Sequence, residues 1–178
     1  AGCATPHIST WPPDQIAAAC TVTHDPFTHT TVVVTPNLTN PGDKHQADIL
    51  TFALAAGIRE GAVRSYILNI RVLRNYHYGP NYFTHAADLA GNTLPLIVTS
   101  LDTPGLLLTD EQQHIPLDRR YLEAITEPWP IRLYGRKGTR DLLLTPEQVH
   151  GFLQRVDLEL DRARRAQQPA PTDPTPTA

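Results

Sequence analysis

The sequence from Thr145 to Ala166 reads TPEQVHGFLQRVDLELDRARRA, and it determines how the rest of the chain is interpreted. Thr145 is a typical N-cap residue, Pro146 stands at the first helical position, and Gln148 completes a capping box. Apolar residues recur on one helical face, at Val149, Phe152, Leu153, Val156, Leu160 and Ala163. The pattern predicts an amphipathic helix about 30 Å long. A helix of this kind covers one face of a sheet.

The residues before this helix have the patterns of strands separated by turns. Residues 17–24 and 27–35 are rich in residues that favour extended structure. Residues 49–56 and 64–74 also read as strands. In the second of these, Tyr66, Leu68, Ile70 and Val72 share one face.

The second half of the chain predicts hairpins and a short helix. We expect hairpins over residues 81–101 and 131–144, each around a glycine-containing turn. Residues 108–117 are expected to form an edge strand, because Pro116 cannot donate to a ladder. The adjacent carboxylates Asp110 and Glu111 then lie on a solvated edge. Asp118 is expected to cap a short helix.

These elements predict an α+β fold. A mostly antiparallel sheet of about six to eight strands packs against the C-terminal helix and one short helix. A length of 178 residues fits one domain. We expect a flexible tether at 1–16, a single α+β domain at 17–166, and a disordered Pro/Thr tail at 167–178.

Composition argues against several functions. The net charge is −3, and the two basic clusters, 136–140 and 162–165, read as a turn and a helix end. Nucleic acid is therefore not an expected partner. The longest apolar stretch, 49–58, is too short for a membrane span, which needs about 20 residues. No serine lies in a Gly-x-Ser-x-Gly motif and no nucleotide-binding glycine motif is present, so no cofactor or catalytic residue is predicted.

The chain begins Ala1-Gly2-Cys3, which resembles the last three positions of a bacterial lipobox. We expect Cys3 to be lipidated, so that the protein contacts a membrane only through this anchor. A disulfide between Cys3 and Cys20, or an ordinary thiol at Cys3, stays open. Cys20 itself is expected to be a small buried residue at the start of a strand.

Several weak motifs from about Thr23 onward resemble a family of uncharacterised bacterial envelope lipoproteins built as small α+β domains. The motifs are Asp25-Pro26-Phe27-Thr28, the Ala-x-Asp-x-x-Gly of residues 86–91, and Leu133-Tyr134-Gly135. The aromatic strand departs from the family pattern, because it carries Tyr82-Phe83 without a tryptophan. The resemblance implies an α+β envelope protein and no catalytic residues.

The densest aromatic segment is a candidate partner-binding loop. Its residues are Tyr76, His77, Tyr78 and Asn81, beside a Gly-Pro turn. The rings of Tyr82 and Phe83 are expected to pack under the final helix instead.

Eight histidines raise the question of a metal site. The candidate ligands are His45 with Asp48 and His85 with Asp88, but scattered surface histidines are the favoured interpretation. His24 and His29, five apart in a strand, point to opposite faces.

Two functions follow from these observations. The first is an exported, lipid-anchored and non-enzymatic envelope protein. It binds an envelope protein or a cell-wall component through its sheet or the aromatic loop. Its location is then periplasmic or associated with the outer membrane of a Gram-negative bacterium, and secreted if Cys3 is not lipidated. The alternative is a periplasmic hydrolase or metal-dependent enzyme that uses the surface His and Asp residues.

Overall fold

The computed structural model describes residues 11–39, 48–75, 79–102 and 108–167. In this part of the chain three helices and ten strands form the predicted α+β fold. The helices are α1 (Pro13–Ala19), α2 (Arg119–Glu123) and α3 (Pro146–Gln167). The strands are β1 (Thr21–Asp25), β2 (Thr30–Val34), β3 (Asp48–Arg59), β4 (Ala62–Asn75), β5 (Phe83–Asp88), β6 (Thr93–Leu94), β7 (Ile97–Asp102), β8 (Leu108–Leu117), β9 (Trp129–Gly135) and β10 (Gly138–Leu144).

The strands form two antiparallel sheets, where the sequence predicted one. The larger has the order β1-β2-β3-β4-β8-β7, and the smaller has the order β10-β9-β5-β6. The hairpin expected over residues 81–101 is correct only in its first half, where β5 pairs with the short strand β6. Pro95 follows β6 and cannot donate to a ladder. The chain then crosses to the other sheet, where β7 pairs with β8.

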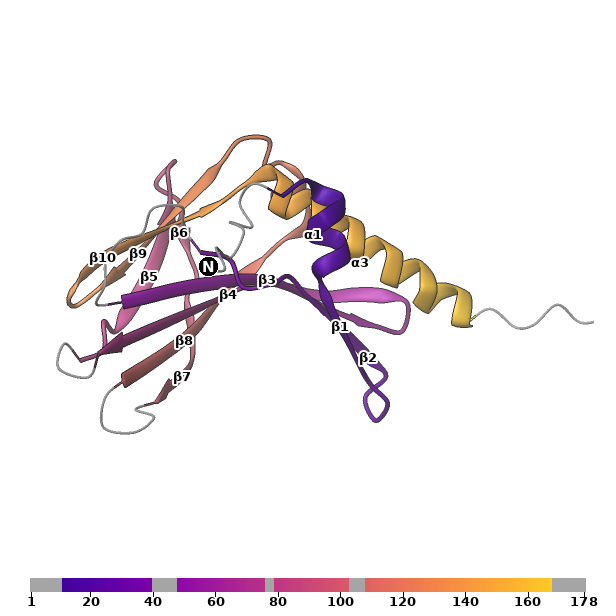
Figure 1. Ribbon diagram of the computed structural model, residues 1–178, viewed down its shortest axis with the longest axis horizontal. Coiled ribbons are helices and arrows are strands. Elements are labelled where there is room, and N and C mark those ends of the chain that lie inside the picture. The colour runs from indigo at the N-terminus through magenta and orange to yellow at the C-terminus, as the bar shows by residue number, and fades with distance from the viewer. Residues whose placement is uncertain (1–10, 40–47, 76–78, 103–107, 168–178) are drawn as a thin grey trace, which may run out of the picture.

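The core lies between the larger sheet and a layer made of the smaller sheet and α3. Alternate residues of β4, from Tyr66 to Val72, are buried on one face, as predicted from their spacing. Phe52 and Leu54 of β3 pair with Ile70 and Leu68 and face the same way. In Figure 1 the smaller sheet lies at the left end of the molecule, whereas α3 runs to the right. Both contribute to one hydrophobic cluster.

The final helix begins as predicted. The Thr145 hydroxyl accepts a hydrogen bond from the Gln148 backbone N–H at 3.4 Å, and the Gln148 Oε1 accepts one from the Thr145 N–H at 2.9 Å. The short helix is also confirmed, with Asp118 accepting from the Arg120 N–H at 2.7 Å. None of the described helices is both long and apolar enough to cross a membrane.

Helix α1 corrects the prediction for the N-terminal region. The sequence predicts a flexible tether at residues 13–16 and a strand from residue 17, yet Pro13–Ala19 is helical. Ile16 is fully buried, and α1 packs on α3. Gly151 permits this packing, because a Cβ there would lie 2.7 Å from Ile16 Cβ and closer still to the Pro13 carbonyl oxygen.

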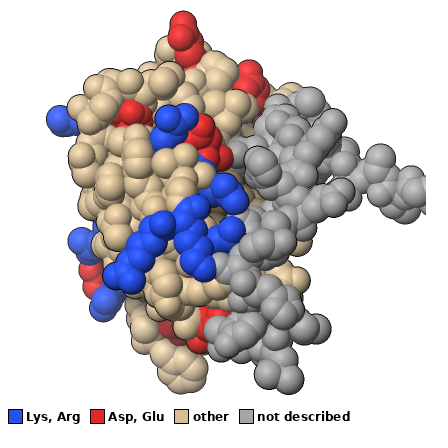
Figure 2. Space-filling model, turned by 90° about the vertical axis from the view of Figure 1, so that its left-hand side faces the viewer, with Lys and Arg blue, Asp and Glu red and all other residues tan. Residues whose placement is uncertain are grey.

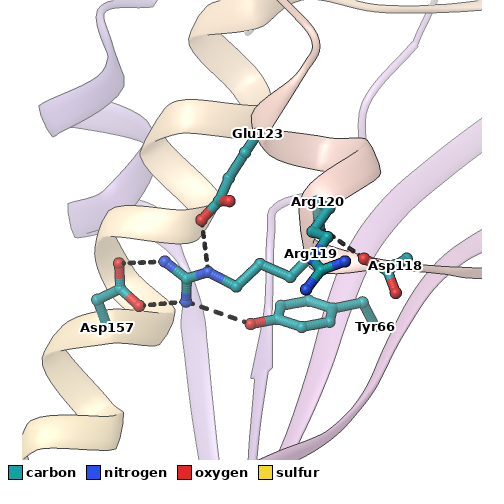
Figure 3. A network of polar contacts seen from close by, with 6 residues as sticks. All are labelled: Tyr66, Asp118, Arg119, Arg120, Glu123 and Asp157. Atoms are coloured by element: carbon teal, nitrogen blue, oxygen red, sulfur yellow. Dashed lines mark hydrogen bonds and ion pairs between the residues drawn. The ribbon is translucent and has the colours of Figure 1, made fainter.

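Arg119 joins α2 to α3 (Figure 3). Its Nη1 and Nη2 donate to the two Asp157 carboxylate oxygens at 2.6 and 2.9 Å. Its Nε donates to Glu123 at 2.6 Å, and Nη1 also lies 3.4 Å from the Tyr66 hydroxyl. Bidentate pairing of this kind fixes both position and angle, so Arg119 sets how α2 meets the side of α3.

Replacing Gly151 with alanine should destabilise the fold. Alanine is the better helix former by about 1 kcal/mol, but its methyl group would collide with the backbone of α1. We expect a net loss of about 1–3 kcal/mol in the free energy of unfolding, as for overpacked sites. Urea unfolding followed by circular dichroism measures it. His150→Ala, at an exposed position beside Gly151, is the control. A Gly151→Ala protein as stable as the parent would show that α1 does not pack here.

Candidate functional site

Strand β8 is an interior strand, which corrects two predictions. It lies between β4 and β7, although Pro116 had suggested an edge. The pairing with β7 ends at His114, two residues before Pro116, so the proline removes no bond from that ladder. Asp110 and Glu111 are therefore not solvated: their residues are 5% and 3% exposed.

Glu111 points into the interior of the protein. It pairs with Val72 and shares a face of β8 with Thr109 and Gln113, all of them buried. Its Oε2 accepts a hydrogen bond from the Asn81 backbone N–H at 3.1 Å. Its Oε1 accepts from the Phe83 backbone N–H at 2.9 Å and from Gln113 Nε2 at 2.7 Å. One buried carboxylate thus holds the two amides that flank Tyr82.

This anchoring determines how residues 79–83 are presented. Tyr82 has a left-handed φ of 51° and is 42% exposed, whereas Phe83 is buried in the core. The prediction that both rings pack under the final helix is therefore wrong for Tyr82. A left-handed backbone is costly for a residue with a bulky side chain. The two bonds from Glu111 hold the backbone on either side of this strained residue.

The turn between β9 and β10 packs against Asn81. The Asn81 carbonyl oxygen accepts a hydrogen bond from the Arg136 N–H at 2.8 Å. Gly135 allows the approach, because a Cβ there would lie 2.7 Å from that oxygen. The Arg136 guanidinium lies over the Tyr82 ring, 5.2 Å from its centroid.

Further cations surround the segment. Arg74 donates from Nη1 to the Asn81 Oδ1 at 2.8 Å, and the Lys137 side chain lies beside Gly79. Figure 2 shows Lys and Arg side chains gathered on this side of the molecule. We call Arg74, Tyr82, Arg136 and Lys137 the basic end. Its chemistry suits an anionic or aromatic ligand, because guanidinium groups bind anions and stack on rings.

The interior beneath the basic end is polar. Asn81 Nδ2, Thr109 Oγ1 and Gln113 Oε1 are buried and have no hydrogen-bond partner among the described residues. Native proteins usually satisfy such atoms with ordered water. Buried polar side chains therefore lie beneath Asn81, beside the hydrocarbon core that contains Phe83.

Asp110 lies on the opposite face of β8 and forms a separate ion pair. Its carboxylate receives Arg71 Nη2 at 2.6 Å and Nε at 3.0 and 3.1 Å. Hydrogen bonding from Arg71 lowers the pKa of Asp110 below its ordinary value, against the opposing effect of burial. This pair joins β4 to β8 beside the basic end.

Some predicted site residues lie outside the described part of the chain. They are Cys3, His45, Tyr76, His77 and Tyr78, together with the side chain of Asp48. Asn81 is described, and it lies at the centre of the basic end. The sequence predicts Glu111 on a solvated edge and Arg136 in a basic turn, and it gives neither residue the role of holding this segment.

His85 and Asp88 do not come together as metal ligands. The His85 ring stacks on Tyr134 with centroids 4.6 Å apart. Asp88 instead accepts hydrogen bonds from Asn92 and from the Tyr121 hydroxyl. Among the described residues, no group of three or more His, Cys, Asp or Glu could hold a metal ion.

Cys20 is a free, buried thiol between α1 and β1, as expected of a small core residue. Its Sγ donates to the Ile16 carbonyl oxygen at 3.3 Å. Burial raises the pKa of Cys20 to about 11, although Arg155 acts in the other direction. The group is therefore a thiol at neutral pH and a poor nucleophile.

No protein-family model, curated protein or solved structure matches the chain.

Removing the Glu111 carboxylate should destabilise the protein and loosen the basic end. Glu111→Ala leaves the Asn81 and Phe83 amides without their acceptor, at an expected cost of about 2–4 kcal/mol in the free energy of unfolding. Chemical denaturation measures the loss. Glu127→Ala, at an exposed position, should change stability by less than about 0.5 kcal/mol. Equal stability of the two variants would contradict the role assigned to Glu111.

The Asp110–Arg71 pair predicts an acid-dependent contribution to stability. A carboxyl group whose folded pKa is lowered stabilises the fold above its unfolded pKa of about 3.9 and loses this contribution as the pH falls through the folded value. Asp110→Asn should therefore be less stable than the parent at pH 7, and the difference should shrink between about pH 5 and 2. Urea unfolding across that range measures it, with Asp161→Asn as an exposed control. A difference that stays constant with pH would rule out the ion pair as its cause.

Proposed function

We propose that the chain is a non-enzymatic binding module of the bacterial envelope, held there through Cys3, and that it binds its partner at the basic end. The partner is an envelope protein or cell-wall component with an anionic surface. The observation that carries the proposal is that Glu111 accepts hydrogen bonds from both the Asn81 and the Phe83 amides. These bonds hold Tyr82 at the surface, where the Arg136 guanidinium lies over its ring.

Preorganisation supports binding at this end. Binding a ligand costs free energy when loops and side chains must be ordered first. Here residues 81–83 are already fixed, because Glu111 accepts from the Asn81 and Phe83 amides and the Arg136 N–H donates to the Asn81 carbonyl oxygen. An exposed tyrosine beside an arginine is also typical of the residues that contribute most to binding energy.

Charge supports an anionic partner. The protein as a whole carries a net charge of −3, yet Arg74, Arg136 and Lys137 gather around one segment. A local positive field of this kind steers oppositely charged partners and raises their rate of association. The alternative function, a hydrolase or metal enzyme, has less support, because His85 and Asp88 are engaged with other neighbours.

Site-specific photocross-linking in envelope-producing cells tests the proposal. A photoreactive phenylalanine derivative replaces Tyr82 in one strain and Phe27 in another. Phe27 is the matched control, because it is also an exposed aromatic residue, 93% accessible, at the tip of the distant β1–β2 hairpin. We expect a reproducible adduct from position 82 only, weakened in an Arg136→Ala/Lys137→Ala background and at raised salt.

Two outcomes count against the proposal in different ways. The absence of an adduct at position 82 above background, or an equal yield from position 27, would contradict binding at the basic end. The intact mass of the native protein tests the anchor separately. A mass that corresponds to unmodified Cys3 would remove the anchor and leave the binding surface to be judged by the cross-links.

A further inference from the structure

Strand β7 forms one edge of the larger sheet, at the bottom of Figure 1. It pairs with β8 on one side, and among the described residues no strand pairs with its other side. A free edge of this kind presents backbone N–H and C=O groups that can pair with a further strand. We call it the β7 edge.

The other three edges of the two sheets carry features that discourage such pairing. Strand β1 ends in His24 and Asp25, β10 contains Arg140 and Asp141, and β6 is only two residues long. Short strands and charged side chains are the usual protection of an exposed edge. In β7, by contrast, residues 97–101 carry no charge. The β7 edge is therefore the one that these devices leave open to pairing.

The β7 edge also exposes apolar side chains. Ile97, Val98 and Leu101 are 45%, 55% and 42% exposed. The described part of the chain exposes nine large hydrophobic side chains, and three of them lie within the six residues of β7. Apolar side chains that gather at one place on the surface indicate a contact with another molecule.

A bulge at Thr99 brings two of these side chains onto one face of the strand. Val98 pairs with Gln113 and Leu101 pairs with Glu111, with Thr99 as the extra residue at the register shift. Gln113 and Glu111 are two residues apart on β8, so they share a face. Val98 and Leu101 therefore also share a face, although they are three residues apart. A regular strand would place them on opposite faces.

We propose that the β7 edge is a dimerisation interface, in which β7 pairs antiparallel with the β7 of a second copy of this chain. A two-fold axis between Thr99 and Ser100 sets Val98 opposite Leu101 of the second copy, and Leu101 opposite Val98. Four apolar side chains then form one cluster on a single face. Both strands carry the same extra residue at the centre, so the ladder stays in register on either side of it. The two larger sheets become one continuous sheet across a symmetric interface.

A strand from a different protein is the competing occupant, because a free edge can also accept an extended segment of a partner. The sequence of β7 favours a second copy. The antiparallel register matches apolar with apolar side chains and Thr99 with Ser100. It also keeps the single charged residue of each strand, Asp102, at opposite ends of the interface, whereas carboxylates placed opposite each other would repel. The β7 edge uses other residues than the basic end, and the proposal does not depend on the proposed function.

Sedimentation velocity of the purified full chain at increasing concentration tests the proposal. A reducing agent prevents disulfides between copies through Cys3 or Cys20. We expect a reversible equilibrium between monomer and dimer. Amide hydrogen exchange at low and high concentration then locates the interface. Amides of β7 should exchange more slowly at high concentration, whereas those of β1, the other edge of the same sheet, should exchange equally at both.

Two charged variants test the register. Val98→Glu and Leu101→Lys each place a charge opposite an apolar side chain of the second copy, and each should raise the dissociation constant of the dimer at least tenfold. An equal mixture of the two variants should restore association, because Glu and Lys then lie opposite each other. Circular dichroism verifies that each variant keeps its fold. Leu158→Lys, at an exposed leucine of α3, is the matched control and should dimerise like the parent.

Several outcomes would overturn the proposal. One is a monomer at every concentration, which would leave the β7 edge to a different partner or to solvent. Another is a dimer that both charged variants leave unchanged, or that Leu158→Lys weakens equally. A mixture of the two charged variants that stays monomeric would exclude the antiparallel register.

Discussion

The Glu111 carboxylate is the interaction on which one end of this fold depends. It lies within the larger sheet, 3% exposed, and accepts hydrogen bonds from the two backbone amides at the entrance to the smaller sheet. A buried charged group without partners is costly, and so is a buried amide without an acceptor. The Glu111 carboxylate and the Asn81 and Phe83 amides supply each other's hydrogen-bond partners. The two sheets are therefore joined at this end by paired polar groups as well as by packed hydrocarbon.

The consequences reach the surface of the protein. Because the Asn81 and Phe83 amides point at Glu111, Tyr82 between them takes a left-handed backbone and is exposed. Arg136 then covers its ring, and the β9–β10 turn packs against Asn81. The far side of the molecule is fixed differently. There Arg119 ties α2 to α3, and Gly151 lets α1 approach the same helix.

Local signals allowed much of the fold to be predicted. The capping box at Thr145 and the β9–β10 hairpin depend on residues close in sequence, and both are present. Helix α1 was missed although its signal is present: Pro13 at the first turn and Asp14 beside it are typical of a helix start. The polar, proline-rich residues around it favour a flexible tether instead.

The candidate site was predictable only in part, for a physical reason. Strand β8 is polar along most of its length, and such a pattern normally indicates solvent exposure. Here Thr109, Glu111 and Gln113 are all buried, and the backbone amides that Glu111 binds belong to Asn81 and Phe83, about thirty positions earlier in the chain. Nothing local in the sequence encodes that contact. The sequence indicates Asn81 as a candidate because it lies beside an aromatic turn. The Glu111 carboxylate and the Arg136 N–H that bind it are distant in sequence, so only the folded structure shows them.

Amide hydrogen exchange at Asn81 and Phe83 tests the central claim most directly. If Glu111 holds these amides, both exchange slowly in the parent protein despite their place beside an exposed loop residue. In Glu111→Ala their exchange accelerates by a larger factor than that of the Leu68 and Ile70 amides in the core. Rapid exchange of both amides in the parent, or an acceleration no greater than in the core, would contradict the account.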